Sequence, residues 1–209
     1  LGEMPLDKRP VVRHQAGKDK DETTRKTYEK MGVEAEITPF IEDMAEAYEW
    51  ADLVICRSGA LTVAELAAAG MASIMVPYLY AVDDHQTANA KYLSDSGAAI
   101  LMPQNDLTKE SLSSLLNELC SDRNKLIEMS IKARKLAKPS ATEEVAAICA
   151  EYAGYDFNQN DSNSADPDTT VSVDKDVEDI NNGWETFVKT IDDGNIEAKD
   201  GKGINYEAA

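Results

Sequence analysis

The sequence has few aromatic residues, few cysteines and no long apolar run. Aromatic side chains make up 6% of the 209 residues, so aliphatic side chains must fill most of the core. No stretch of about 18 apolar residues appears, which excludes an ordinary membrane-spanning helix, and the first residues contain no apolar signal segment. The cysteines Cys56, Cys120 and Cys149 form no CxxC pair. Their spacing does not support a zinc site and predicts reduced, mostly buried thiols in a cytoplasmic protein.

Positive charge is also scarce. The chain carries 21 Lys and Arg against 39 Asp and Glu, a formal net charge of -18. Such a field repels phosphate backbones, so we expect no nucleic-acid partner. An anionic ligand would need local help from backbone N–H groups at the start of a helix. Because the chain begins with Leu1 rather than Met, we also expect it to be part of a longer protein.

Apolar runs of strand length alternate with helical patterns through the first two thirds of the chain. This alternation predicts an α/β fold with a doubly wound, Rossmann-like parallel sheet covered on both faces. The expected strands are residues 10–14, 33–37, 52–56, 72–77 and 98–102, and the expected helices are 21–31, 44–50, 62–69, 85–94, 108–119, 122–137 and 140–152. Ser140 or Thr142 is expected to cap the last helix.

The composition changes after residue 154. From residue 152 onward the chain has 14 acidic and 4 basic side chains. We therefore predict a domain over 1–154 and an acidic, mostly disordered tail over 155–209, because such a segment buries too little apolar surface to offset its ordering entropy. Trp184, Phe187, Val188 and Ile191 follow helical spacing and predict a short amphipathic helix within 182–192.

The segment from Arg57 to Glu65 joins a buried strand to a helix. Ligands of open parallel sheets bind at that edge. Gly59 would let the backbone approach a ligand, and the N–H groups of Ala60, Leu61 and Thr62 could hold a pyrophosphate. Glu65, expected in the first helical turn, could accept hydrogen bonds from ribose hydroxyls. The alternative is a capping box of Thr62 and Glu65, which needs no ligand.

Two further segments carry weaker signals of the same kind. Gln86 and Asn89 share a helix face, where their amides suit the hydroxyl and acetamido groups of a sugar; the alternative is a cap by Asp83 with Gln86. The backbone of Ile41 could pair with a base and Met44 could lie against its face; the alternative places Met44 in the core.

Histidine is rare as well. His14 and His85 are the only histidines and no nucleophile accompanies them, so a catalytic triad is unsupported. His14 ends a strand at the expected ligand edge, where it is either structural or in contact with phosphate.

Taken in order, these segments resemble the C-terminal domain of the MurG-type N-acetylglucosaminyltransferases of glycosyltransferase family 28, which have the GT-B fold. The matching stretches are His14 to Gly17, Phe40 to Met44, Arg57 to Glu65 with Gly70, and Val82 to Ala90. The resemblance covers about residues 5–152.

That resemblance implies an enzyme that transfers N-acetylglucosamine from its uridine diphosphate donor to lipid I with inversion, giving lipid II for peptidoglycan. No cofactor or metal is implied. The implied donor-binding residues are Ile41, Met44, Ser58, Ala60, Leu61, Thr62, Val63, Ala64, Glu65, Gln86 and Asn89. Ile41 would contact uracil, Ala60 to Thr62 the phosphates, Glu65 the ribose, and Gln86 with Asn89 the sugar.

The chain departs from the family in what is missing. The acceptor loop, the expected catalytic base, the membrane-facing patch and the first strand of the C-terminal domain have no counterpart here, so no catalytic residue is expected in this chain. The lipid-linked acceptor, and peripheral association with the cytoplasmic face of the bacterial inner membrane, would require the missing half. Two alternatives stay open: a donor-binding subunit of a split lipid-linked transferase, and a non-catalytic relic or interaction module.

Overall fold

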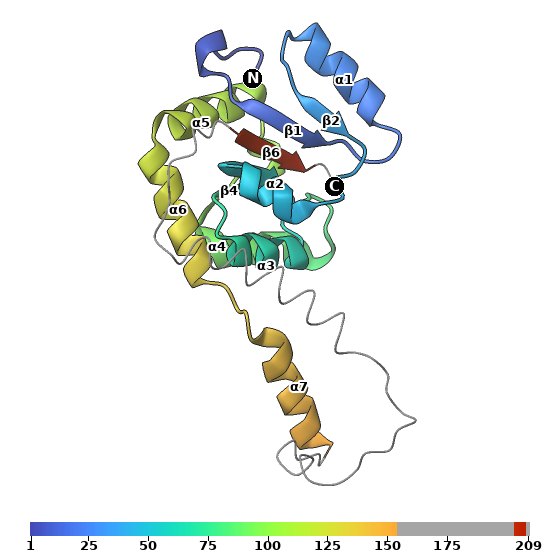
Figure 1. Ribbon diagram of the computed structural model, residues 1–209, viewed down its shortest axis with the longest axis vertical. Helices are drawn as coiled ribbons and strands as arrows, with labels where there is room; N and C mark the ends of the chain where they lie inside the picture. The colour runs from blue at the N-terminus through green and yellow to red at the C-terminus, as the bar shows by residue number, and fades with distance from the viewer. Residues whose placement is uncertain (154–202, 208–209) are drawn as a thin grey trace. The chain divides into compact units, whose positions relative to one another are not determined.

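The computed structural model describes residues 1–153 and 203–207 of the chain, and its centre is a parallel sheet (Figure 1). The strand order is β2-β1-β6-β3-β4-β5, and every neighbouring pair is parallel. The predicted α/β class is confirmed. The strands are β1 Val11–Gln15, β2 Glu36–Thr38, β3 Leu53–Cys56, β4 Ser73–Met75, β5 Ala99–Leu101 and β6 Gly203–Glu207.

Helices occupy the connections between the strands. They are α1 Asp21–Lys30, α2 Met44–Trp50, α3 Ala60–Ala69, α4 His85–Ser94, α5 Lys109–Ser121, α6 Arg123–Lys135 and α7 Ala141–Tyr152, with short 3-10 turns η1 Leu6–Lys8, η2 Val82–Asp84 and η3 Gln104–Asp106. These bounds agree with the predicted helices to within one residue except at three ends: α3 begins two residues earlier than expected, α5 ends two residues later and α6 ends two residues earlier. The predicted strand over 33–37 also moves, since β2 begins only at Glu36.

The core lies on both faces of β3 and β4. Every residue of these two strands is buried, as expected for parallel strands covered by helices. One cluster joins Leu53 and Ile55 of β3 with Ile74 of β4, and the helices α5 and α6 cover it with Leu116 and Leu126 among others. Val54, Cys56, Ser73 and Met75 alternate with these residues and are buried too. The burial of apolar side chains on both faces of β3 and β4 therefore makes these strands the centre of the core.

The order in which the strands are laid down reverses direction at β3. From β1 the chain moves outward to β2, and from β3 it moves outward the other way to β4 and β5. The loops after β1 and β3 therefore leave the sheet in opposite directions. Open sheets of this kind bind ligands beside such a reversal, at the carboxyl ends of the strands.

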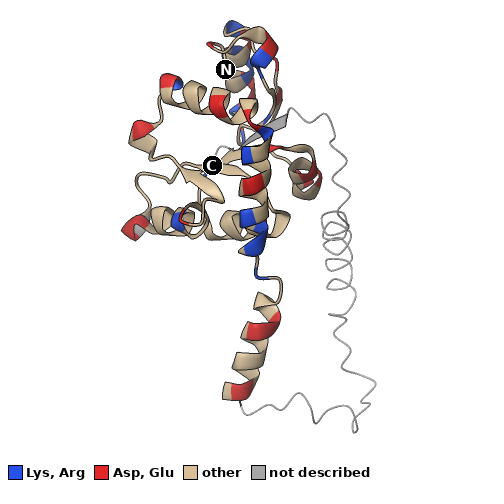
Figure 2. Ribbon diagram, turned by 90° about the vertical axis from the view of Figure 1, so that its left-hand side faces the viewer, with Lys and Arg blue, Asp and Glu red and all other residues tan. Residues whose placement is uncertain are grey.

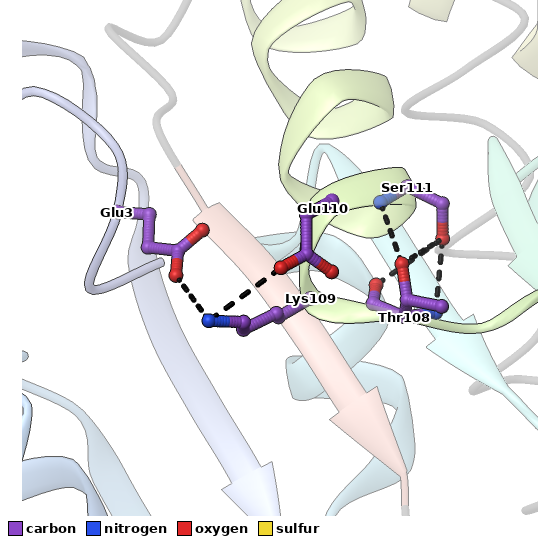
Figure 3. A network of polar contacts seen from close by, with 5 residues as sticks. All are labelled: Glu3, Thr108, Lys109, Glu110 and Ser111. Atoms are coloured by element: carbon purple, nitrogen blue, oxygen red, sulfur yellow. Dashed lines mark hydrogen bonds and ion pairs between the residues drawn. The ribbon is translucent and has the colours of Figure 1, made fainter.

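The N-terminal segment is tied to the start of α5 (Figure 3). Lys109 Nζ lies 2.9 Å from Glu3 Oε1 and 3.5 Å from Glu110 Oε1. Thr108 caps α5 in a capping box with Ser111, in which each side chain accepts from the other residue's backbone N–H. These exposed ion pairs contribute little energy, so the box is the main local determinant of where α5 begins.

Residues 1–137 and 198–209 form one compact unit, and 138–197 form a second. The described part of the second unit contains α7, which carries Glu143, Glu144 and Glu151 and no basic residue (Figure 2). Ser140 is the N-cap residue of α7, but its side chain makes no capping hydrogen bond, so the predicted cap is wrong. The predicted boundary at 154, the tail and the helix 182–192 fall on residues that lie outside the described ones, apart from β6.

Candidate donor-binding site

The first element of the candidate site is the start of α3. Gly59 is its N-cap residue, with φ -60° and ψ 150°, and no side chain caps the helix. Val63 N–H donates to Gly59 O at 3.0 Å and closes the first turn. The capping-box alternative is wrong, because Thr62 lies inside the helix rather than at its cap. The N–H groups of the first turn therefore point outward along the helix axis at the strand edge, with the positive end of the helix dipole.

The side chains at the start of α3 differ in solvent exposure. Ala60 and Ala64 are exposed, and the Leu61 side chain is 79% exposed. Val63 is buried in the core and its N–H donates to Gly59 O, so neither its side chain nor its N–H is available to a ligand. An added Cβ on Gly59 would meet only Thr62 Oγ1, at 3.6 Å. The fold itself therefore does not require glycine at position 59. A ligand that approaches the backbone closely would be a reason for glycine there.

Glu65 lies in the second turn of α3 rather than the first. Its Oε2 accepts a hydrogen bond of 3.0 Å from the hydroxyl of Tyr48 on α2. Tyr48 is buried, while Glu65 is half-buried. This contact fixes one carboxylate oxygen, and an ionised carboxylate still has acceptor positions for further donors. Sequence reasoning missed Tyr48, which no motif marks.

Ser58, Gln86 and Asn89 form the second element. The buried Ser58 hydroxyl donates to the backbone oxygen of Gln86 at 2.8 Å, and Asn89 Nδ2 donates to the backbone oxygen of Ser58 at 3.0 Å. Gln86 Oε1 accepts from the Tyr78 backbone N–H at 2.9 Å. These bonds bring the start of α4 against the residue that precedes Gly59. Each amide has one group engaged with backbone and its other group available for a ligand.

The turn before α4 has unusual backbone geometry. Asp83 and Asp84 have φ values of 51° and 53°, in the left-handed region that Asp tolerates better than most residues. The predicted cap by Asp83 with Gln86 is wrong, because Gln86 reaches Tyr78 instead. Asp84 is the N-cap residue, and its Oδ1 accepts from the Thr87 hydroxyl at 2.6 Å. The left-handed backbone of Asp83 and Asp84 turns the chain into α4, whose first residues bond to Ser58.

Ile41 lies three residues before α2, and Met44 is the first residue of that helix. The Ile41 N–H donates to Gln15 Oε1 of β1 at 2.8 Å, so its backbone carbonyl, not its N–H, is the group left for a base. Met44 opens α2 and is half-buried rather than part of the core. Gln15 is a positioning residue that the sequence analysis did not identify.

A cavity of about 190 Å³ lies beside Ile41. Four carboxylates, of Glu36, Glu42, Asp43 and Glu46, are among its lining residues, and its one arginine, Arg13, is paired with two of them. The cavity includes no residue of α3 or α4, so it does not join Ile41 to Glu65 or Gln86. Its negative charge makes it unsuited to a diphosphate.

Arg57 organises the loops around the site. Its Nη1 donates to the backbone oxygens of Val76 and Pro77 at 3.1 and 3.3 Å and to Gln104 Oε1 at 2.8 Å. Its guanidinium also lies over the Tyr78 ring, 5.4 Å from the centroid. One side chain thus links the ends of β3, β4 and β5. Arg57 begins the segment from Arg57 to Glu65, but its contacts with the loops after β4 and β5 appear only in the tertiary structure.

His14 has a structural environment. It is buried in β1, with Nδ1 3.1 Å from the Tyr28 hydroxyl of α1, and burial lowers its pKa. Of the two roles left open for His14, this contact favours the structural one. The thiols also differ from expectation: Cys56 is buried, but Cys120 and Cys149 are exposed. Among the described residues, no group of His, Cys, Asp and Glu could hold a metal ion, and no helix is long and apolar enough to cross a membrane.

Comparison with known proteins matches this arrangement to a family. Residues 5–145 match the model of the glycosyltransferase family 28 C-terminal domain. A UDP-N-acetylglucosamine--N-acetylmuramyl-(pentapeptide) pyrophosphoryl-undecaprenol N-acetylglucosamine transferase of Pseudomonas putida is 56% identical over 153 residues, which are 73% of this chain and 43% of that protein. The transferase of the same name from Dechloromonas aromatica is 56% identical over 144 residues, 69% of this chain and 40% of that protein.

A solved structure gives the same result in three dimensions. The crystal structure of Acinetobacter baumannii MurG aligns with a TM-score of 0.67 at 44% identity, covering 72% of this chain and 45% of that one. The chain therefore spans less than half the length of the relatives it matches. The fold is shared over that part, and the relatives contain a further half that this sequence does not include.

Proposed function

The chain belongs to the glycosyltransferase family 28 C-terminal domains, and from this membership we propose that it is the half of an inverting N-acetylglucosaminyltransferase that binds UDP-N-acetylglucosamine. The acceptor would be the lipid-linked N-acetylmuramyl sugar named for the relatives, held by the other half. Lipid II synthesis would then take place at the cytoplasmic face of the inner membrane once both halves are together. We expect no catalytic turnover from this chain alone.

One observation carries the proposal: the start of α3 follows Gly59, has no side-chain cap and lies beside the reversal in strand order. In a chain of net charge -18, such a backbone site is the means by which a diphosphate can be held. Favourable interaction of an anion with a helix N-terminus is worth about 0.3–1 kcal/mol when exposed and about 2 kcal/mol when partly buried.

The side chains around α3 fit the remaining parts of the donor. Glu65, oriented by Tyr48, has acceptor positions for the ribose hydroxyls. Gln86 and Asn89, joined through Ser58, offer neutral donors and acceptors for the sugar. We assign Ile41 and Met44 to the base. Ala60, Leu61 and Thr62 would contribute backbone N–H groups rather than side chains. Val63, whose N–H already donates to Gly59 O, and Ala64, further into the helix, would only line the site.

Isothermal titration calorimetry with UDP-N-acetylglucosamine tests donor binding. We expect a dissociation constant near millimolar, because one wall of the cleft is absent, and weaker binding of UDP-glucose, which lacks the acetamido group. The variant Glu128→Gln, which removes one exposed carboxylate from α6, is the matched control for Glu65→Gln. Absence of heat at millimolar donor, also after addition of a separately produced N-terminal half of a relative, would contradict the proposal and favour a relic or interaction module.

A transferase assay on the two-chain mixture then separates a split enzyme from an isolated donor domain. Turnover of a lipid I analogue only when both chains are present would support function as a subunit. Donor binding without turnover in the mixture would limit the proposal to binding.

A further inference from the structure

The side-chain amide of Gln86 has a fixed orientation. Its Oε1 accepts from the backbone N–H of Tyr78 at 2.9 Å. Because an N–H group can only donate, the oxygen of the amide has to face Tyr78, and its NH2 group is the part that can meet a ligand. Asn89 is oriented the opposite way, since its Nδ2 donates to the backbone oxygen of Ser58 at 3.0 Å and its Oδ1 is left to accept. The two amides therefore present one donor and one acceptor.

The N–H group that orients this amide lies between two anchors in the loop after β4. The backbone oxygen of Pro77, one residue before Tyr78, accepts from Arg57 Nη1 at 3.3 Å. The N–H of Leu79, one residue after Tyr78, donates to Gln104 Oε1 at 3.4 Å. The position of the Tyr78 N–H therefore depends on a side chain on each side of it.

Gln104 connects the two anchors. Its Oε1 also accepts from Arg57 Nη1 at 2.8 Å, so one oxygen bonds both to the guanidinium and to the loop. A hydrogen bond from a charged donor is stronger than one between neutral groups, so the contact with Arg57 contributes most of the anchoring. Gln104 is half-buried, begins η3 after β5, and is separated from Arg57 by 47 residues of sequence. No motif of the sequence marks it.

We propose that Gln104 is a positioning residue for sugar recognition: it holds the loop after β4 so that the Tyr78 N–H keeps the NH2 group of Gln86 turned toward the sugar. The inference rests on the proposed function, because it needs a nucleotide sugar beside Gln86. A hydroxyl group can meet either a donor or an acceptor, whereas the carbonyl oxygen of an acetamido group can meet only a donor. The orientation of this amide therefore bears on which sugar is accepted.

The effect of Gln104 should be confined to the sugar. Without an acceptor at position 104, the Leu79 N–H loses its partner and Arg57 is no longer linked to the end of β5. The Gln86 amide is then less firmly held and can turn over. Among the residues that the structure describes, no hydrogen bond joins Gln104 to α3, where we place the diphosphate and the ribose. Affinity for the nucleotide alone should therefore stay the same.

NMR titration of the full chain with UDP-N-acetylglucosamine and with UDP measures the contribution of the sugar as the ratio of the two dissociation constants. Gln104→Met removes the oxygen at nearly equal side-chain length. We expect binding of the nucleotide sugar to weaken about three- to tenfold, the range of one neutral hydrogen bond, with binding of UDP unchanged. Gln104→Glu keeps an oxygen for Arg57 and should restore the parent ratio. Asn105→Leu, which removes an exposed amide from the same turn, is the matched control and should change neither constant.

A double-mutant cycle tests whether the effect passes through Gln86. In Gln86→Ala, the further change Gln104→Met should cost no additional affinity for the nucleotide sugar, because the amide that it orients is gone. In the parent chain, the side-chain NH2 signals of Gln86 should shift on addition of UDP-N-acetylglucosamine and not of UDP, and Gln104→Met should reduce that shift. If Gln104→Met does not fold, Gln104→Asn, which shortens the side chain by one carbon, should give the same losses.

The outcomes separate the two proposals. A parent chain that binds neither UDP nor the nucleotide sugar overturns the proposed function. A parent chain that binds both, while the variant without the acceptor at position 104 keeps the parent ratio or loses affinity equally for both ligands, overturns the positioning role alone. The same holds if Gln104→Met weakens sugar binding equally with and without Gln86.

Discussion

Replacing Gly59 with alanine separates the fold from the ligand site. The residue has φ -60° and ψ 150°, a conformation open to any amino acid. The added methyl group meets only Thr62 Oγ1, at 3.6 Å, which is ordinary van der Waals contact. The protein therefore offers no steric reason against alanine, and any large effect must come from the ligand.

The free energy of unfolding should change little in this variant. Alanine is a poorer N-cap residue than glycine, by about 0.5–1 kcal/mol. It also reduces the entropy of the unfolded chain, which stabilises the fold by about 0.4–1 kcal/mol at a compatible position. The two effects oppose each other, so we expect a net change below about 1 kcal/mol.

Donor binding should fall much further. Phosphate oxygens accept from backbone N–H groups at about 2.7–3.0 Å. If the diphosphate lies at the start of α3 as proposed, a methyl group at Gly59 would take space that such an oxygen needs. Loss of one hydrogen bond to a charged group costs about 1.5–3 kcal/mol, which corresponds to roughly 10- to 150-fold weaker binding.

Urea unfolding and calorimetry on the same preparations measure both quantities. Gly70→Ala is the contrasting control, because Gly70 has φ +65° and its added Cβ would lie 3.3 Å from Arg134 Cβ. That variant should lose about 1–2 kcal/mol of stability and keep most of its affinity. If Gly59→Ala bound the donor as tightly as the parent chain, the diphosphate could not lie at the start of α3.

Three further results are expected. Ser73→Ala should raise the free energy of unfolding in urea by about 1 kcal/mol, because the Ser73 hydroxyl is buried and makes no hydrogen bond; a loss of stability would refute this. Glu65→Gln should weaken donor binding about tenfold in calorimetry, and Tyr48→Phe about threefold, by removing the hydroxyl that orients the carboxylate; unchanged affinity in both would exclude Glu65 from the site. Burial lowers the pKa of His14, so the unfolded chain binds a proton at this residue more readily than the folded chain does. The free energy of unfolding should therefore fall as the pH decreases below about 6.5, and it should fall less steeply in His14→Gln.

Local signals were sufficient for most of the fold. Gly32 and Gly70, which stop α1 and α3, have the positive φ values that such helix ends use, 61° and 65°. The run from Leu53 to Cys56 is apolar throughout and is buried throughout. Spacing alone misplaced the start of α3, because Thr62 and Glu65 have the pattern of a capping box while Gly59 carries no side-chain signal at all.

The sequence by itself determined the class of fold, the approximate positions of its first five strands and the family, since these depend on the period of apolar residues and on short contiguous motifs. Tertiary structure alone decided which side chains contact the candidate residues. Tyr48 bonds to Glu65, Gln15 bonds to Ile41, and Arg57 joins three strand ends, and all of these contacts link segments far apart in sequence. It also decided that Gly203–Glu207 is a strand, because a weak strand former takes that form only where two unpaired strand edges already flank it.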